Sequence, residues 1–174
     1  MKKWIEKHSI LLSLLLVIAV MVMIYSFSAQ TGEESGALSG RLTRWVLSIF
    51  VPGFENWAAQ EQENLLSTVG LLVRKLGHFT EYALLGFSLL LHITQLRKKW
   101  MIKLPLLWAW GIGTIYAASD EFHQSFVGGR GPAVTDVMID SAGVIAGVML
   151  MVLILQIRKK PAIIKKKHAK GREI

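Results

Sequence analysis

The sequence has no cysteine among its 174 residues, and Asp, Glu, Lys and Arg together make up only 18% of it. The absence of cysteine excludes disulfides, iron–sulfur clusters and catalysis by a thiol. Hydrophobic residues make up 52% of the chain, and the mean hydropathy is +0.43. This balance is typical of a small integral membrane protein rather than of a soluble domain.

Several motifs that would announce a known chemistry are also absent. The chain has no H-E-x-x-H zinc motif, no Ser nucleophile elbow, no P-loop and no dinucleotide-binding fingerprint. His78, Glu81, His123 and Asp136 belong to residue types that bind metals, but their spacing matches no established zinc site. We therefore predict no metal and no cofactor.

Four apolar stretches are predicted to form membrane-spanning helices, at residues 9–27, 76–96, 104–120 and 134–157. Each is close to the roughly 20 residues that a spanning helix needs. The first stretch could instead be a signal peptide, but its apolar run is long and Phe27-Ser28-Ala29 is a poor cleavage site. We expect a retained anchor, in an all-α integral membrane four-helix bundle that occupies residues 1–157.

The net charge of +8 is distributed unevenly along the chain. Residues 28–75 and 119–136 hold five Lys and Arg against eight Asp and Glu, and all other Lys and Arg lie before the first span, at 97–103 or after residue 157. This is the positive-inside pattern, which predicts a multi-pass cell-membrane protein with both termini in the cytoplasm. Residues 158–174 are predicted to be a basic cytoplasmic tail beside anionic lipid, and no nucleic-acid partner is expected.

The first extracytoplasmic region is predicted to contain two short amphipathic helices. Residues 28–40 are rich in Ser, Gly and acid and are predicted to form a loop. Apolar residues then recur with helical spacing over 41–50 and again over 58–75. The first of these helices would either lie in the membrane interface or pack on the membrane helices, and the second could run directly into the span at 76–96.

The polar stretch at residues 119–136 carries more charge than a turn between membrane helices needs. The alternating helix directions should bring this stretch, His78 and Glu81, and Asp136 and Asp140 to the same outer face. Ionisable groups within a membrane span are costly and are candidates for function. The candidate ligand-binding residues are His78, Glu81, Tyr82, Glu121, His123, Gln124, Arg130, Asp136 and Asp140.

Two features of this set have alternative explanations. Glu81 and Asp140 could instead form a buried ion pair or a hydrogen bond between helices, and Arg74, Lys75 and Asp120 could be ordinary boundary charges. The candidates for an acid or a base in catalysis are His78, Glu81, Glu121 and Asp136. Gly143 and Gly147 form a G-x-x-x-G pair, which favours close helix packing either within the chain or in a homo-oligomer.

Three segments together resemble a known family. The sequence reads KLGHFTEY at residues 75–82, SDEFHQSF at 119–126 and GRGPAVTD at 129–136. This combination resembles the VanZ-like family, small bacterial membrane proteins named for a teicoplanin-resistance protein, over about residues 10–157. The resemblance implies a multi-pass cell-envelope protein and, for the namesake, lowered sensitivity to a glycopeptide antibiotic. Asp140 departs from the pattern, because many relatives carry Asn there.

Three functions follow from these observations. The first is an outer-leaflet polar pocket that binds a lipid-linked or phosphate-bearing envelope component, with Arg130 on the phosphate, membrane lipids as partners and an influence on teicoplanin-type sensitivity. The second is a membrane-embedded hydrolase or transferase that acts on an envelope lipid. The third is transport of a small ion or a proton. The sequence alone leaves open whether the chain is an enzyme.

Overall fold

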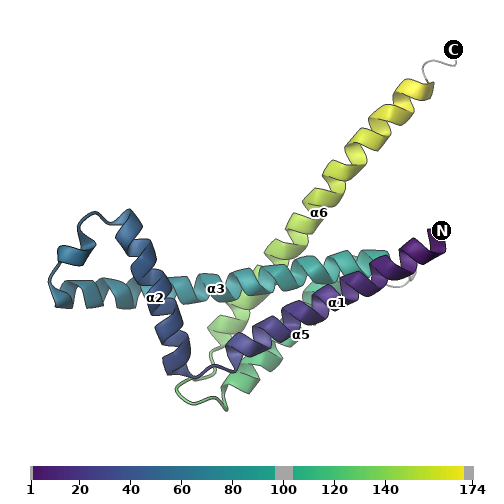
Figure 1. The fold of residues 1–174 in the computed structure, drawn as a ribbon. Coiled ribbons are helices and arrows are strands. Elements are labelled where there is room, and N and C mark those ends of the chain that lie inside the picture. The colour runs from purple at the N-terminus through teal and green to yellow at the C-terminus, as the bar shows by residue number, and fades with distance from the viewer. Residues whose placement is uncertain (1, 97–103, 171–174) are drawn as a thin grey trace.

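The computed structural model describes residues 2–96 and 104–170, and within these ranges the chain is helical with no strand (Figure 1). The predicted all-α class is therefore confirmed. The turn predicted at residues 97–103 lies outside the described residues. The elements are α1 (Lys2–Ser28), α2 (Gly32–Phe50), the short 3-10 helix η1 (Phe54–Asn56), α3 (Ala59–Gln95), α5 (Pro105–Gln124) and α6 (Val134–Lys170).

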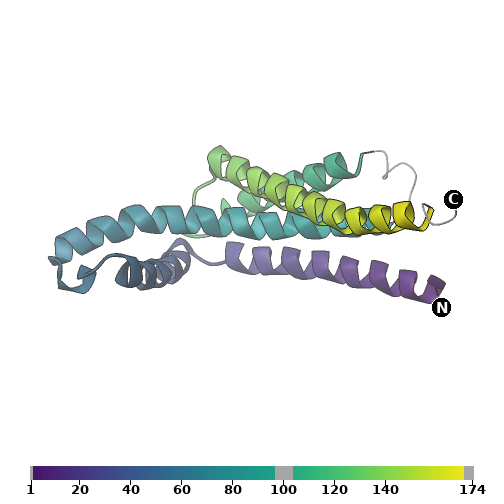
Figure 2. The same cartoon turned by 90° about the horizontal axis from the view of Figure 1, so that it is seen from above.

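The four longer elements, α1, α3, α5 and α6, alternate in direction (Figures 1 and 2). The start of α1 and the end of α6 lie on one side of the molecule, and α2 and the start of α3 lie on the other. The most extensive interface between two helices is that of α3 with α6, and the next is that of α1 with α3. Tyr82, Leu85 and Leu89 of α3 are buried with Val144 and Val148 of α6, and together they form the centre of the core.

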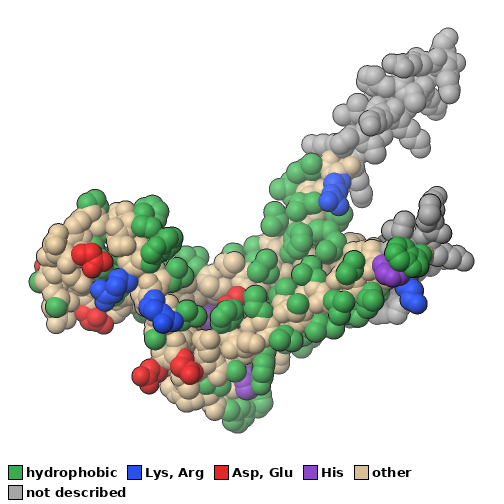
Figure 3. Space-filling model, in the orientation of Figure 1, with side chains coloured by type: hydrophobic (Ala, Val, Ile, Leu, Met, Phe, Trp, Pro, Cys, Tyr) green, Lys and Arg blue, Asp and Glu red, His purple; other side chains and the backbone are tan. Residues whose placement is uncertain are grey.

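Two helical segments are long and apolar enough to cross a bilayer, Lys7–Ser28 in α1 and Val134–Arg158 in α6, with mean hydropathies of 2.8 and 2.3. Hydrophobic side chains cover much of the visible surface of α1 and of the described part of α6 (Figure 3). The predicted spans at 76–96 and 104–120 are helical but do not meet the same criterion. Two spans are thus supported by length and hydropathy, and the four-helix membrane bundle stays a prediction.

The second amphipathic helix and the second predicted span are one continuous helix, α3. No proline interrupts residues 59–95, and Glu61 in the first turn suits the positive end of the helix dipole. With 37 residues, α3 is about 55 Å long at 1.5 Å per residue. A bilayer core of about 30 Å cannot cover this length, so part of α3 extends beyond any membrane that it crosses.

The prediction of a loop over residues 28–40 is wrong, because α2 begins at Gly32. Thr31 caps the helix: its hydroxyl accepts the backbone N–H of Glu34, and its own backbone N–H donates to the Glu34 carboxylate at 2.8 Å. These hydrogen bonds from Thr31 lower the pKa of Glu34. This capping box outweighs the low helix propensity of the glycines and serines that follow.

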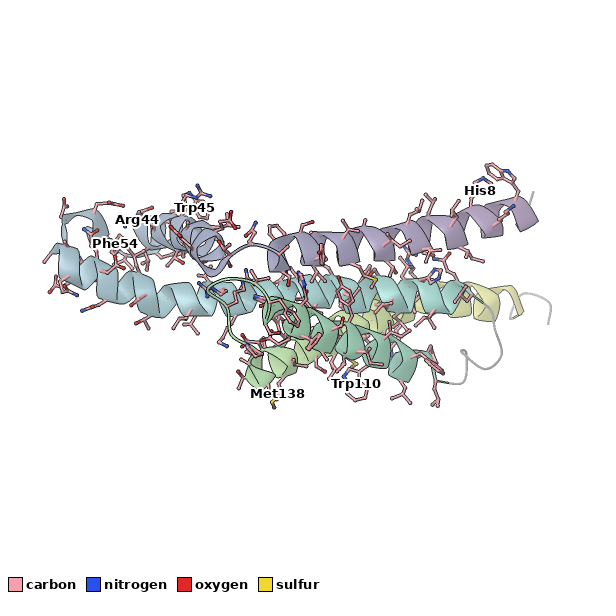
Figure 4. All side chains as sticks on the ribbon, turned by 90° about the horizontal axis from the view of Figure 1, so that it is seen from below. His8, Arg44, Trp45, Phe54, Trp110 and Met138 are labelled. Atoms are coloured by element: carbon pink, nitrogen blue, oxygen red, sulfur yellow. The ribbon has the colours of Figure 1, made fainter. Side chains whose placement is uncertain are left out.

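The amphipathic face of α2 is exposed rather than packed. Helix α2 crosses the direction of α1 and α3 steeply (Figures 1 and 2), and it turns Thr43 and Leu47 inward. Trp45 and Ile49, on the predicted apolar stripe, are 61% and 54% exposed. Figure 4 places Trp45 at the end of the molecule opposite His8. An exposed apolar stripe on a helix that crosses the bundle favours the membrane-interface interpretation over packing.

The G-x-x-x-G pair on α6 is used for packing within the chain. A Cβ added at Gly143 would lie 2.4 Å from the Phe79 carbonyl oxygen, and one at Gly147 would lie 1.8 Å from that of Ala83. Gly86 of α3 makes the reciprocal contact, because its Cβ would lie 2.2 Å from the Val144 oxygen. The two backbones are therefore in direct contact, as small residues permit.

Candidate functional site

Ionisable side chains from α3, α5, α6 and the loop at residues 125–133 meet at one end of the bundle. Asp140 of α6 interacts electrostatically with Glu81 of α3 and with Asp120 and Glu121 of α5. Arg130 of the loop interacts electrostatically with Glu81, Asp120 and Glu121. We call this set the polar cluster, and its members are His78, Glu81, Asp120, Glu121, Arg130, Asp136 and Asp140.

The loop that carries Arg130 is fixed against the junction of α1 and α2. Arg130 donates from Nη2 to the carbonyl oxygen of Phe27 at 3.2 Å, and the backbone N–H of Gly32 donates to the oxygen of Gly128 at 3.0 Å. Gly129 has a φ of 75°, a left-handed conformation that glycine adopts without strain. Burial and the neighbouring Arg74 both lower the pKa of Arg130, which nevertheless stays charged at neutral pH.

Several candidate residues have structural partners. Gln124 donates from Nε2 to the Asp120 carboxylate at 3.1 Å, and the Glu121 carboxylate accepts the backbone N–H of Ala133. The His123 ring stacks on Tyr25 of α1 with centroids 5.0 Å apart. These contacts hold the end of α5 in place. They therefore give the polar residues at 120–124 a structural role that requires no ligand.

Lys75 and Asp136 form an ion pair between α3 and α6, with 2.7 Å between Nζ and Oδ1. Both side chains are more than a third exposed. Exposed pairs of this kind contribute about 0–1 kcal/mol to stability. The pair joins the two helices at the surface of the cluster, and it leaves less of Asp136 available to a ligand than the sequence suggested.

His78, Tyr82 and Asp140 lie deeper and keep polar atoms without hydrogen bonds. Asp140 is 1% exposed and Tyr82 is 0% exposed, and His78 Nδ1 lies 3.8 Å from Asp140 Oδ1. A small cavity of about 100 Å³ is lined by His78, Asp140, Asp136 and Lys75, among others. Because a buried polar atom without a partner costs about 1–3 kcal/mol, His78 and Asp140 are the members of the polar cluster that packing explains least.

A larger cleft of about 330 Å³ opens beside the cluster, between the end of α1, α2, α3 and the Arg130 loop. Its charged lining residues are Arg74, His78 and Glu81 of α3 and Arg130 of the loop. Four apolar side chains also line it, together with the polar Gln30, Ser35 and Ser39, and we call these four the apolar wall: Phe27 of α1, Leu38 and Leu42 of α2 and Val73 of α3. We call this space the amphipathic cleft.

Arg74 is a residue of this site that the sequence indicated to be an ordinary boundary charge. It lies one and two turns before His78 and Glu81, at the i, i+4 and i+7 positions of one helix face. Continuing α3 backward from the predicted span would have placed it there. Of the apolar wall, only Leu38 lies in the stretch predicted to be a loop, whereas Phe27, Leu42 and Val73 lie in stretches predicted to be helical.

Among the described residues, no three His, Asp or Glu side chains are arranged to hold a metal ion. Of the residue types named earlier as metal ligands, His78 and Glu81 line the amphipathic cleft, Asp136 pairs with Lys75, and His123 stacks on Tyr25. The side-chain contacts in and beside the polar cluster are therefore hydrogen bonds, ion pairs and the ring stack of His123 on Tyr25.

The structure is that of a helical protein with two apolar segments long enough to span a membrane. Acidic side chains, Asp120, Glu121 and Asp140, are buried at one end of its helix bundle. The family model described as VanZ/LLP1 matches residues 13–155, and the chain belongs to the VanZ/LLP1 family. This confirms the resemblance seen in the three sequence segments, and together with the two apolar helices it indicates a membrane protein. No curated protein and no solved structure matches the chain.

Proposed function

We propose that this protein crosses the membrane four times and binds a phosphate-bearing or lipid-linked component of the cell envelope in the amphipathic cleft, at the outer leaflet. The single observation that carries the proposal is the lining of the cleft, which combines two arginines with the apolar wall. Binding of such a component would also influence sensitivity to glycopeptide antibiotics of the teicoplanin type.

The alternating helices support the topology. The start of α1 and the end of α6 lie on the same side of the molecule, and the cationic ends of the sequence would both face the cytoplasm there. The amphipathic cleft lies toward the opposite side, near α2 and the Arg130 loop. With this arrangement the cleft opens at the level of the outer head groups.

The two arginines supply the affinity for an anion. Arg74 makes no hydrogen bond or ion pair with any other described residue, whereas Arg130 is held by Phe27. The Arg74 guanidinium disfavours the charge of Arg130, since the two like charges repel each other. A phosphate between them would remove this repulsion and accept charge-assisted hydrogen bonds from both.

The apolar wall supplies the affinity for a chain. Leu38 and Leu42 of α2 are 41% and 50% exposed, and Phe27 at the end of α1 is 39% exposed. A soluble anion would leave these side chains in contact with water. An acyl or prenyl chain would cover them, at about 25 cal/mol for each Å² of apolar surface removed from water.

The first prediction concerns Arg74. Arg74→Gln should weaken binding of a polyprenyl phosphate by about tenfold to a hundredfold, because a charge-assisted hydrogen bond contributes about 1.5–3 kcal/mol. The measurement is the rise in the unfolding temperature of the purified protein with increasing polyprenyl phosphate. Arg130→Gln should have a similar effect on this rise, together with a lower starting temperature, since it also loses the bond to Phe27.

Arg158→Gln is the matched control, because it also removes one arginine charge but lies on α6 far from the amphipathic cleft. It should respond to the lipid like the unmodified protein. An unchanged response of Arg74→Gln and Arg130→Gln together would show that the cleft does not bind the phosphate.

A second candidate function, hydrolysis or transfer on an envelope lipid, is favoured by His78 Nδ1 and Asp140 Oδ1, buried atoms that make no hydrogen bond within the described residues. A histidine 3.8 Å from a buried carboxylate can exchange a proton with a ligand bound in the adjoining cleft. Purified protein incubated with labelled envelope lipids should then give a product that is lost in His78→Gln. Binding without turnover would leave the protein as a binding module.

A further inference from the structure

The groove between α2 and α3 continues the amphipathic cleft away from the predicted membrane. It has a volume of about 410 Å³, larger than the cleft itself. Arg74 and Ser39 line both spaces, so they meet at these two residues. A ligand whose phosphate lies at Arg74 therefore has room to extend along α3 toward Glu63.

The lining of this groove is polar and mixed in charge. Arg41, Arg44 and Arg74 supply donors, and Glu63 supplies an acceptor. Arg44 donates to Gln62 at 3.4 Å, whereas Arg41 and Glu63 make no hydrogen bond or ion pair with another described residue. Figure 3 shows Lys and Arg side chains over α2 on the visible face of the molecule.

Glycines keep the groove open. Gly36, Gly40 and Gly70 line it, and a Cβ added at Gly40 would meet no atom within 4 Å. The absence of a side chain at Gly40 is therefore not required by packing, in contrast to Gly143 and Gly147 on α6. Gly40 leaves a space that helix packing does not use.

We propose that the groove between α2 and α3 binds the sugar of a phosphate-linked glycolipid whose phosphate lies at Arg74. A second phosphate would benefit from Arg41 but would be repelled by Glu63. Sugar hydroxyls both donate and accept, so they match Glu63 and Arg41 together. This inference rests on the proposed function, and it names the substrate class of the same site.

The experiment compares two phosphodiesters that differ only in the sugar, a polyprenyl methyl phosphate and a polyprenyl phosphate carrying a disaccharide, which is long enough to extend from Arg74 toward Glu63 along α3. The full-length protein should bind the glycosylated lipid about tenfold more tightly, as two or three added hydrogen bonds imply. Glu63→Gln should remove most of this difference, and Gly40→Leu should remove all of it by filling the groove. Both variants should bind polyprenyl phosphate like the unmodified protein.

Glu61→Gln is the matched control, since Glu61 lies two residues before Glu63 on α3 and does not line the groove. It should keep the full preference for the glycosylated lipid. The inference fails if Gly40→Leu and Glu63→Gln retain that preference, or if polyprenyl diphosphate without a sugar binds as tightly as the glycosylated lipid. The proposed function is tested separately, because Arg74→Gln and Arg130→Gln should weaken binding of polyprenyl phosphate, whereas Glu63→Gln and Gly40→Leu should not.

Discussion

Gly147→Leu should destabilise the protein by about 3 kcal/mol or more, because overpacking of a tight interface has this cost even where side chains can adjust. At this position the clash is with backbone, since the added Cβ would lie 1.8 Å from the Ala83 carbonyl oxygen. Helices α3 and α6 would have to separate along their most extensive interface. The measurement is the unfolding temperature of the purified protein in detergent, together with its yield.

Gly111→Leu on α5 is the control, because a Cβ there meets nothing within 4 Å. It should unfold close to the temperature of the unmodified protein. Equal stability of the two variants would show that α6 does not pack on α3 through Gly147.

Single cysteines should give a nearly all-or-none result for topology. The chain has no cysteine of its own, so any introduced thiol is the only one in the protein. Gln60→Cys and Phe126→Cys should react with a membrane-impermeant maleimide on intact cells, because the proposed topology places both exposed positions outside. Lys7→Cys and Arg158→Cys should react only after the cells are permeabilised.

The four positions test the orientation, and they show whether the chain crosses the membrane an even number of times between Gln60 and Phe126. Each lies in a different predicted segment outside the bilayer or at its boundary. Labelling of Gln60→Cys on intact cells but of Phe126→Cys only after permeabilisation would show that just one of α3 and α5 crosses the membrane. Labelling of Lys7→Cys on intact cells would reverse the orientation.

Local sequence signals predicted the helices well. The apolar runs anticipated α1 and α6, and Pro105 at the first position of α5 marks the start of that helix. The start of α2 was missed although its signal is present, since Thr31 and Glu34 form a T-x-x-E capping box. The Ser, Gly and acidic composition of residues 28–40 favours a loop, but the capping box determines the structure of this stretch.

The candidate site was predicted in part. The sequence brought His78, Glu81 and Arg130 to one level, and the structure places all three along the amphipathic cleft. The apolar wall could not be predicted, because it depends on the angle at which α2 crosses α3, and no spacing in the chain encodes that angle. The ion pair of Lys75 with Asp136 joins residues 61 positions apart and likewise needs the tertiary structure.

The continuity of α3 has a consequence for how this protein can vary. Because no break separates its outer half from its inner half, one inserted residue between Glu63 and Arg74 would rotate everything before it by about 100° relative to His78. Such an insertion would turn Glu63 away from Arg41 while leaving both side chains intact. The half of α3 that carries Glu63 can therefore change residue by residue, but its length is locked in phase with the half that carries His78 and Glu81.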